Sequence, residues 1–261
     1  MSSESTEVQD IVNIIGVKIN ESIVDTYDWK VISTSLYGMQ CMSSSQEVVR
    51  TLLWALTRKI NKLPPHEISS WSLGNMLLGL KSMNSDVREV QGLISALNRA
   101  IKFNFKGFRA PEDISCAMFG LQGCRSSHPP VRDIMLTLSH VIRNSSVVVT
   151  PQAVSMMLYG LKNMVNDHNS VESLLISLAP KIASCKGPMT PAEICTSIYG
   201  LQGMSCKSAP IRNILTFLLE QWQFSDSNYS INSLGMFFLG IQSMNSSTVV
   251  SLFICCAPNT F

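Results

Sequence analysis

One short phrase recurs six times along this chain at nearly constant spacing, and each copy carries a glycine at its centre. The copies read ISTSLYGMQCM, LGNMLLGLKSM, ISCAMFGLQGC, VSMMLYGLKNM, ICTSIYGLQGM and LGMFFLGIQSM. Successive central glycines are 41, 41, 40, 40 and 40 residues apart, and they are Gly38, Gly79, Gly120, Gly160, Gly200 and Gly240. A fixed period of this length is typical of proteins that stack one structural unit on the next. The sequence therefore predicts an elongated array.

The residues around each central glycine have the spacing of an amphipathic helix. With the glycine as position 0, positions −6, −2, +1 and +4 are apolar in every copy, as in Ile114, Met118, Leu121 and Cys124. Spacings of four, three and three residues place them on one helical face. Position −10 holds mostly good N-cap residues, and they are Asp28, Ser69, Ala110, Thr150, Thr190 and Ser230. We call this predicted element helix A.

A second helical pattern, helix B, follows each copy after a polar loop. Positions +11, +14, +15, +18 and +22 are apolar in the five complete units, as in Val171, Leu174, Leu178 and Ile182. This is again the spacing of one helical face. The sequence therefore predicts an all-α fold, an α-solenoid of stacked antiparallel helix pairs with a repeat of about 40 residues.

The period also sets the boundaries of the units. Residues 1–28 are read as a polar start plus the helix B of an incomplete preceding unit, because Val8, Ile11, Val12 and Ile15 fall on helix B positions. A sixth unit ends inside its helix B, so we expect the chain to be a fragment of a longer array. The predicted units are 29–69, 70–110, 111–150, 151–190, 191–230 and the truncated 231–261.

The recurring glycine needs a physical reason, because glycine inside a helix costs about 1 kcal/mol relative to alanine. Position +3 is also small or short in every copy, and positions 0 and +3 lie about 60° apart around a helix. We expect them to form a notch for a neighbouring helix, with approach of a ligand to the backbone as the alternative. The residues at +3 are Cys41, Ser82, Gly123, Asn163, Gly203 and Ser243.

Two further positions form the candidate ligand-reading row, because −1 and +2 also lie about 60° apart on the helix. Position +2 is always Gln or Lys, and it holds Gln40, Lys81, Gln122, Lys162, Gln202 and Gln242. Position −1 is aromatic in four copies, in Tyr37, Phe119, Tyr159 and Tyr199. Rings and amide or ammonium donors suit unpaired bases, which stack on rings and offer hydrogen-bonding edges. The alternative is that the rings pack between units and that position +2 is structural or solvated.

Charge is scarce in this chain. Charged residues make up 15% of it, below the ~25% of an average soluble protein, and Lys+Arg 20 against Asp+Glu 18 gives a formal +2. This balance lacks the basic footprint of a strong nucleic-acid binder and favours a protein partner. Five Lys and Arg residues lie near the end of helix B, and RNA phosphates and the negative end of the helix dipole are their alternative partners. They are Arg58, Lys59, Arg99, Arg143 and Lys181. A second group at +12, Arg50, Arg132 and Arg212, is interrupted by Gln91 and Glu172, which argues against a continuous phosphate track.

Other classes of function lack their signatures. The chain has no P-loop, G-x-S-x-G or H-E-x-x-H motif, and none of its 8 cysteines forms a C-x-x-C pair. We therefore expect no enzyme, no metal, no cofactor and no small-molecule substrate. The start MSSESTEVQD resembles neither a secretory signal nor a transit peptide, and no apolar run approaches the ~20 residues that span a membrane. The cysteines are predicted to be reduced, in an intracellular compartment.

The unit resembles the octotricopeptide repeats of organellar RNA-binding proteins, which are helix pairs with a Leu-Trp-Ala-Leu-like core after a Pro-containing turn. The matching core here is Ile198-Tyr199-Gly200-Leu201, with Pro191 upstream. Tyr-Gly in place of Trp-Ala, and the period of 40–41 residues, depart from that pattern. The resemblance implies a role in RNA metabolism in mitochondria or plastids.

Two non-enzymatic functions follow from these observations. The first is binding of single-stranded RNA along helix A. The second is a protein-interaction scaffold that holds a peptide or a partner helix in its concave face.

Overall fold

The computed structural model describes residues 6–22, 28–224, 229–242 and 244, and within these ranges the chain is helical apart from its loops. The A helices are α2 (Trp29–Gly38), α4 (Ser70–Leu78), α6 (Pro111–Phe119), α8 (Pro151–Tyr159), α10 (Pro191–Gly200) and α12 (Ile231–Gln242). The B helices are α1 (Thr6–Glu21), α3 (Glu47–Ile60), α5 (Arg88–Asn104), α7 (Pro129–Arg143), α9 (Asn169–Ala183) and α11 (Ala209–Phe224). A short 3-10 helix, η1 (Gly120–Gly123), follows α6. The predicted all-α fold is confirmed for the described residues.

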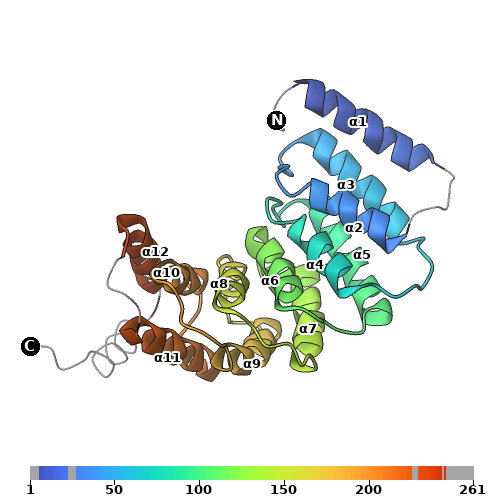
Figure 1. Cartoon of the computed structure of the whole chain (residues 1–261). Helices are drawn as coiled ribbons and strands as arrows, with labels where there is room; N and C mark the ends of the chain where they lie inside the picture. Colours follow the sequence, from blue (N-terminus) through green and yellow to red (C-terminus); the bar gives the residue numbers. More distant parts are fainter. Residues whose placement is uncertain (1–5, 23–27, 225–228, 243, 245–261) are drawn as a thin grey trace, which may run out of the picture.

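The helices form two layers. Each A helix packs against the next A helix, from α2 to α12, and each B helix packs against the next B helix, from α1 to α11. Figure 1 shows the result as a bent array in which the A helices lie on the inner side of the bend and the B helices on the outer side. The first pair of helices and the last pair lie at opposite ends of the array.

The helix starts follow the predicted capping chemistry. The side chains of Asp28, Ser69 and Thr150 accept hydrogen bonds from the backbone N–H groups at their third helical positions. Thr190 and Glu193 form a capping box at the start of α10. Because the first N–H groups of a helix have no partner inside it, each such cap contributes about 1 kcal/mol. Ala110, which has no polar side chain, makes no cap at α6.

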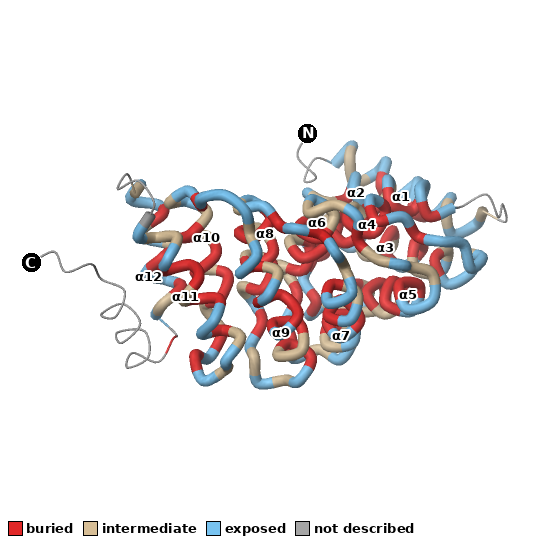
Figure 2. The backbone as a smooth tube through the Cα atoms, turned by 60° about the horizontal axis from the view of Figure 1, so that its bottom comes forward, coloured by how far each residue is buried: buried red, intermediate tan, exposed pale blue. Residues whose placement is uncertain are grey.

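The core lies between the two layers, where Figure 2 shows the buried residues gathered. At position −2, the side chains of Leu36, Leu77, Met118 and Leu158 are all 0% exposed. Full burial of such a side chain stabilises the fold by about 1.5–3 kcal/mol relative to exposure. The predicted apolar stripes are therefore the faces by which the helices pack.

The central glycines receive the backbone of the preceding A helix. Gly160 has φ −58° and ψ −20°, a right-handed conformation open to any residue, so packing and not conformation explains it. A Cβ built on it would lie within 3.0 Å of the Met118 carbonyl, closer than real Cβ atoms come. The Cα–H of glycine faces that carbonyl instead, which is the arrangement of a weak Cα–H···O contact. The same close approach occurs at Gly79, Gly120, Gly200 and Gly240.

Position +3 contributes to the same notch. A Cβ on Gly123 or Gly203 would also meet the carbonyl of Met83 or Met164 at less than 3.0 Å. The predicted notch for a neighbouring helix is therefore confirmed at these positions, and a backbone carbonyl of the preceding unit fills it. Ligand approach to the glycine, the alternative interpretation, is wrong for the glycines that are filled in this way.

Helix α1 packs against α3 at the place of a preceding helix B, as expected from its apolar positions. The predicted helix B of the sixth unit, within 245–261, lies outside the described residues. Six cysteines of the described part are free, and burial raises the pKa of Cys124 to about 12. Among the described helices, none combines the length and apolar character required to cross a bilayer.

Candidate functional site

The residues at position +2 lie along the A layer, where the A helices end. Lys81, Gln122 and Lys162, from three successive units, line one cavity of about 260 Å³. The loops of the same units complete its wall with Ser82, Met83, Asn84, Gly123, Arg125 and Asn163. The structure thus brings three of the six predicted +2 residues to one polar cavity with three cationic side chains. We call it the A-layer cavity.

The aromatic side chains at position −1 form a row beside this cavity. The ring centroids of Phe119 and Tyr159 are 5.5 Å apart with planes at 24°, and those of Tyr159 and Tyr199 are 5.8 Å apart with planes at 38°. A base inserted between two rings needs two stacking distances of about 3.4 Å each. The gaps between these rings are therefore too narrow for a base, and the facing sides of the rings pack against each other. Tyr37 is exposed and lies outside this row. The next A helix has Leu78, which carries no ring, at position −1.

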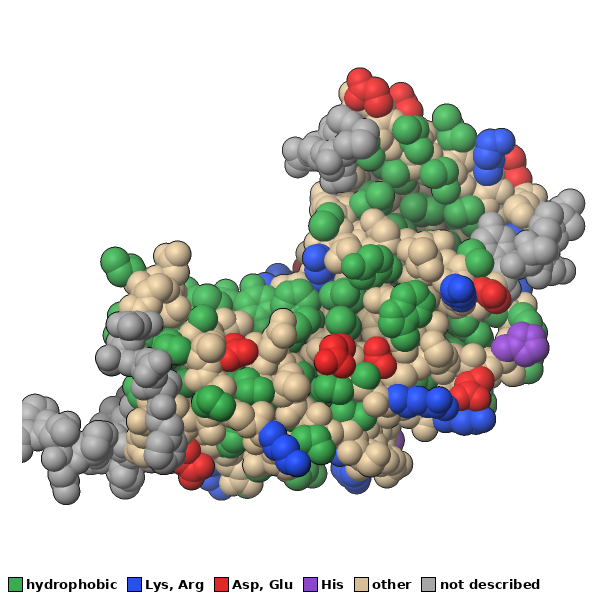
Figure 3. Space-filling model, viewed as in Figure 1, with side chains coloured by type: hydrophobic (Ala, Val, Ile, Leu, Met, Phe, Trp, Pro, Cys, Tyr) green, Lys and Arg blue, Asp and Glu red, His purple; other side chains and the backbone are tan. Residues whose placement is uncertain are grey.

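Lys162 connects the aromatic row to the cavity. Its ammonium lies 4.4 Å from the centre of the Tyr159 ring, 3.1 Å from the Tyr159 hydroxyl oxygen and 3.2 Å from Gln122 Oε1. A lysine ammonium has three N–H donors, and these contacts use two of them. Figure 3 shows apolar side chains along the inner edge of the array over α6, α8 and α10, with Lys or Arg side chains near α4 and α6. This edge therefore combines rings, amides and cations.

Position +2 also has a structural role. Gln202 Nε2 donates to the Lys162 carbonyl at 2.9 Å, which ties two units together. The neighbouring +3 side chains make the same kind of bond, from Asn163 Nδ2 to the Gln122 carbonyl and from Ser82 Oγ to the Gln40 carbonyl, both at 2.7 Å. The structural interpretation thus holds for Gln202. Gln242 is exposed, and Gln40 is half-buried at the first unit.

Several cationic residues of the B helices donate hydrogen bonds to nearby loops or to the preceding unit. Arg50, Arg132 and Arg212 at +12 each donate to two carbonyls of the loop before their own helix, at 2.7–3.3 Å. Arg58 and Arg99 reach Asn20 and Asn61 of the preceding unit. Lys59 and Lys181 donate to the carbonyls of Ser22 and Ser145. The partners of these four side chains are amide oxygens and backbone carbonyls of the preceding unit, in addition to the dipole of their own helix.

The loop residues of the A-layer cavity were missed by sequence reasoning. Arg125 forms an ion pair of 3.2 Å with Asp86, so its charge is partly balanced. A hydrogen bond from His128 Nε2, with the nearby Arg125 as a smaller cause, lowers the pKa of Asp86. The serine that recurs at +6 in three units could have indicated these loop contacts. The hydroxyl oxygens of Ser44, Ser85 and Ser126 each accept a hydrogen bond from the backbone N–H at +5 of the next unit. That bond ties each +5 residue, Arg125 included, to the loop of the preceding unit.

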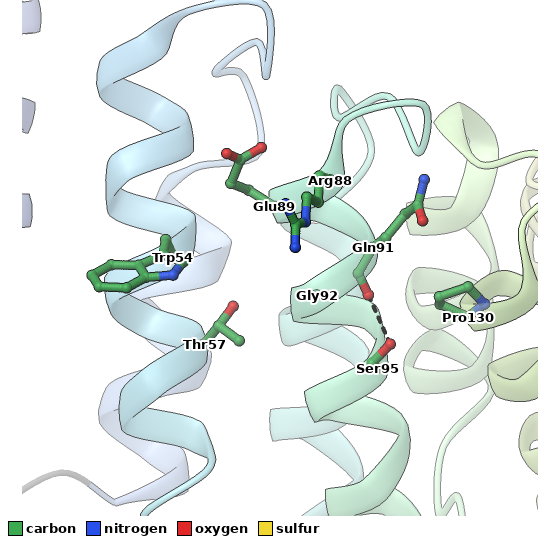
Figure 4. A pocket seen from close by; sticks show the side chains of 8 residues that line it. All are labelled: Trp54, Thr57, Arg88, Glu89, Gln91, Gly92, Ser95 and Pro130. Carbon is green, nitrogen blue, oxygen red and sulfur yellow. Dashed lines mark hydrogen bonds between the residues drawn. The ribbon is translucent and has the colours of Figure 1, made fainter.

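A second cavity lies on the outer, B layer. It measures about 620 Å³ between α3 and α5, with Trp54 on one side and Pro130 at the start of α7 on the other. Figure 4 shows Gly92 in the second turn of α5 at this cavity, with the side chains of Arg88 and Glu89 one turn before it. Arg58 stacks on Trp54, with its guanidinium carbon 4.8 Å from the ring centre. This cavity contains none of the predicted site residues.

In the part of the chain that the structure describes, no group of three or more His, Cys, Asp or Glu side chains is placed to hold a metal ion. No protein-family model, no curated protein and no solved structure matches the chain.

Proposed function

We propose that this chain is a non-enzymatic α-solenoid with a repeat of about 40 residues that binds single-stranded RNA along its A layer. The observation that carries the proposal is the A-layer cavity, in which Lys81, Lys162 and Arg125 of three successive units surround the amide of Gln122. Lysine and arginine bind phosphate oxygens, and amides bind base edges. The resemblance to octotricopeptide repeats points in the same direction and adds an organellar setting to the proposal.

The aromatic row supports a particular geometry for the RNA. Because the rings of Phe119, Tyr159 and Tyr199 stack on one another, bases would lie across their exposed edges and not between them. The strand would follow the row and place its phosphates at the lysines. With a formal charge of +2 for the whole chain, few phosphate contacts are available. We therefore expect moderate affinity and a shallow salt dependence.

The test is fluorescence anisotropy of a labelled pool of random single-stranded RNA, titrated with the protein at several salt concentrations. The variant is Lys81→Gln with Lys162→Gln, because Gln occupies the same position in the four other units and is compatible with the fold. Each lost phosphate contact lowers the slope of log K against log salt by about 0.7 for a single strand. We expect weaker binding and a slope smaller by about 1.4.

The control variant removes the same charge elsewhere. Lys102→Gln with Lys186→Gln changes two exposed lysines that lie outside the A-layer cavity. We expect this variant to bind as the wild type does. Equal losses in both double variants would mean that net charge, and not the A-layer cavity, decides binding. Absence of binding at about 100 µM, where even nonspecific contacts are detectable, would refute the proposal.

A second candidate function is a protein-interaction scaffold, for which one specific observation exists. Trp54, Leu136 and Ile176 occupy the same position of three B helices and are exposed. Trp54 also lines the cavity of about 620 Å³ on the B layer. Exposed aromatic and aliphatic side chains of this kind are common at protein interfaces. A complex with a partner protein that contains no RNA, and that Trp54→Ala disrupts, would support this function.

A further inference from the structure

The cations of the A-layer cavity occur at one place in the array and do not recur along its length. Position +2 is lysine in the second and fourth units, at Lys81 and Lys162, and glutamine in the other four. Position +5 is arginine in the third unit alone, at Arg125. A groove that follows a nucleic-acid backbone has positive charge spread along it. A single cluster of cations instead fits one phosphate group that is held at a fixed place.

The cavity offers hydrogen-bond donors that no other part of the protein uses. No described residue accepts a hydrogen bond from the ammonium of Lys81 or from Gln122 Nε2. Lys162 uses two of its three N–H groups, on Gln122 Oε1 and on the Tyr159 hydroxyl oxygen. None of the described residues that line the cavity is acidic. The free donors therefore favour a ligand with negative charge and several acceptor oxygens.

The charge of the cavity distinguishes between two kinds of phosphate. Arg125 is paired with Asp86 at 3.2 Å, so the charges of Lys81 and Lys162 are the ones left without a carboxylate. A phosphodiester inside a strand carries one negative charge and has two free oxygens. A terminal phosphate monoester carries a charge of about −1.5 to −2 at pH 7 and has three acceptor oxygens. The terminal group therefore matches both the two lysines and the number of free donors.

We propose that the A-layer cavity binds the terminal phosphate monoester of an RNA strand. Lys81 and Lys162 contact its oxygens, and Gln122 Nε2 donates to it. This inference rests on the proposed function, because it takes the A layer to be the surface that binds RNA. The strand leaves the cavity along the aromatic row, where its first bases lie on the exposed edges of the rings. The cavity thus fixes one end of the strand relative to the units.

The test compares three RNA oligonucleotides of one sequence, about 10 nucleotides long, with an internal fluorescent label. One has a 5′-phosphate, one a 3′-phosphate, and one has hydroxyl groups at both ends. We expect one of the two phosphorylated forms to bind about tenfold more tightly than the hydroxyl form, which is the effect of one charge-assisted hydrogen bond. The form that binds more tightly identifies the end of the strand that the cavity holds.

Two double variants locate the site of this preference. Lys81→Gln with Lys162→Gln should bind the three oligonucleotides with similar affinity, whereas Lys102→Gln with Lys186→Gln should keep the preference of the wild type. A preference that survives in the first variant would overturn the proposal, because the phosphate would then be bound elsewhere. Comparison of the melting temperatures of both variants with that of the wild type separates loss of binding from loss of folding.

The remaining outcomes separate this inference from the proposed function. Equal affinity of the wild type for all three oligonucleotides would overturn the terminal-phosphate site and leave RNA binding by the A layer intact. Absence of binding by all three would refute both. Inorganic phosphate, added as a competitor at constant ionic strength, separates a strand end from a free phosphate. If it bound as tightly as the phosphorylated oligonucleotide, the strand would contribute nothing and the assignment to a strand end would be wrong.

Discussion

The smallest perturbation of the array is one methyl group at Gly160. In Gly160→Ala, the new Cβ would lie against the carbonyl of Met118 in the preceding A helix, and 3.1 Å from the backbone nitrogen of Phe119. Both neighbours belong to the backbone of the preceding unit, so no side-chain rotation relieves the overlap. Helices α6 and α8 must therefore separate or tilt, and the apolar contacts on either side of them loosen.

The magnitude follows from two opposing effects. Alanine is favoured over glycine by up to about 1 kcal/mol in a helix, and Gly160 has helical backbone angles at the C-cap of α8. Overpacking a close-packed interior costs about 1–3 kcal/mol, and an overlap with backbone belongs at the upper end of that range. We therefore expect Gly160→Ala to lower the free energy of unfolding by about 2 kcal/mol, although alanine is the better helix former.

The matched control is Gly92→Ala in α5. This glycine lies inside the helix, and a Cβ built on it meets no atom within 4 Å. Only the gain in helix propensity applies there, so we expect this variant to be more stable than the wild type by about 1 kcal/mol.

The assay is thermal unfolding of the three proteins, followed by circular dichroism. A chain of this size changes its melting temperature by about 2–4 °C per kcal/mol, which predicts a difference of about 6–12 °C between the two variants. Midpoints are compared because stacked units unfold with limited cooperativity. The packing argument would be refuted if Gly160→Ala melted at or above the temperature of the wild type.

Two further predictions concern polar contacts between units. Thr137→Val keeps the shape of a buried side chain but removes the hydroxyl that donates to Asn98 Oδ1 at 2.6 Å, so we expect a loss of about 1–3 kcal/mol. Thermal melting against Thr137→Ser, which keeps the hydroxyl, checks this, and equal melting of the two would contradict it. The pKa of Asp86 is lowered on folding, chiefly by its hydrogen bond from His128, so Asp86 stabilises the fold at neutral pH and loses this effect as the pH falls below about 4. The ordinary pKa of an aspartate is about 3.9. Between pH 5 and 3, the melting temperature should therefore fall less steeply for Asp86→Asn than for the wild type.

Much of the local structure could be predicted from the sequence because its causes are local. The spacing of the apolar residues placed each helix and its buried face, and the polar residue ten positions before five of the six central glycines located the starts of those A helices. The caps at Asp28, Ser69, Thr150 and Thr190 involve residues three positions apart, so one stretch of sequence contains both partners. Ala110 shows the limit of the pattern, because α6 begins there without a side-chain cap.

The candidate site could be predicted only in part. The helical wheel placed positions −1 and +2 on neighbouring faces, and the structure places the cavity and the aromatic row on one edge. The wheel could not show that Phe119, Tyr159 and Tyr199 stack too closely to admit a base. It also could not show that Gln202 binds the backbone of the preceding unit while Lys81 lines a cavity. Both depend on the distance and rotation from one unit to the next.

The helices, their buried faces and the notch at each central glycine thus follow from the residue pattern along the chain. Those features depend on the 3.6-residue period of the helix and on the absence of a side chain at Gly160 and its equivalents. The atoms that enter the notch, and the cations that neighbouring units bind, depend instead on how the helices pack. Residues 40 positions apart meet according to how helices stack, and small differences in that stacking decide whether Lys162 reaches Gln122 or faces solvent. Gly38 shows the contrast, since the same glycine is open where no preceding A helix packs on it.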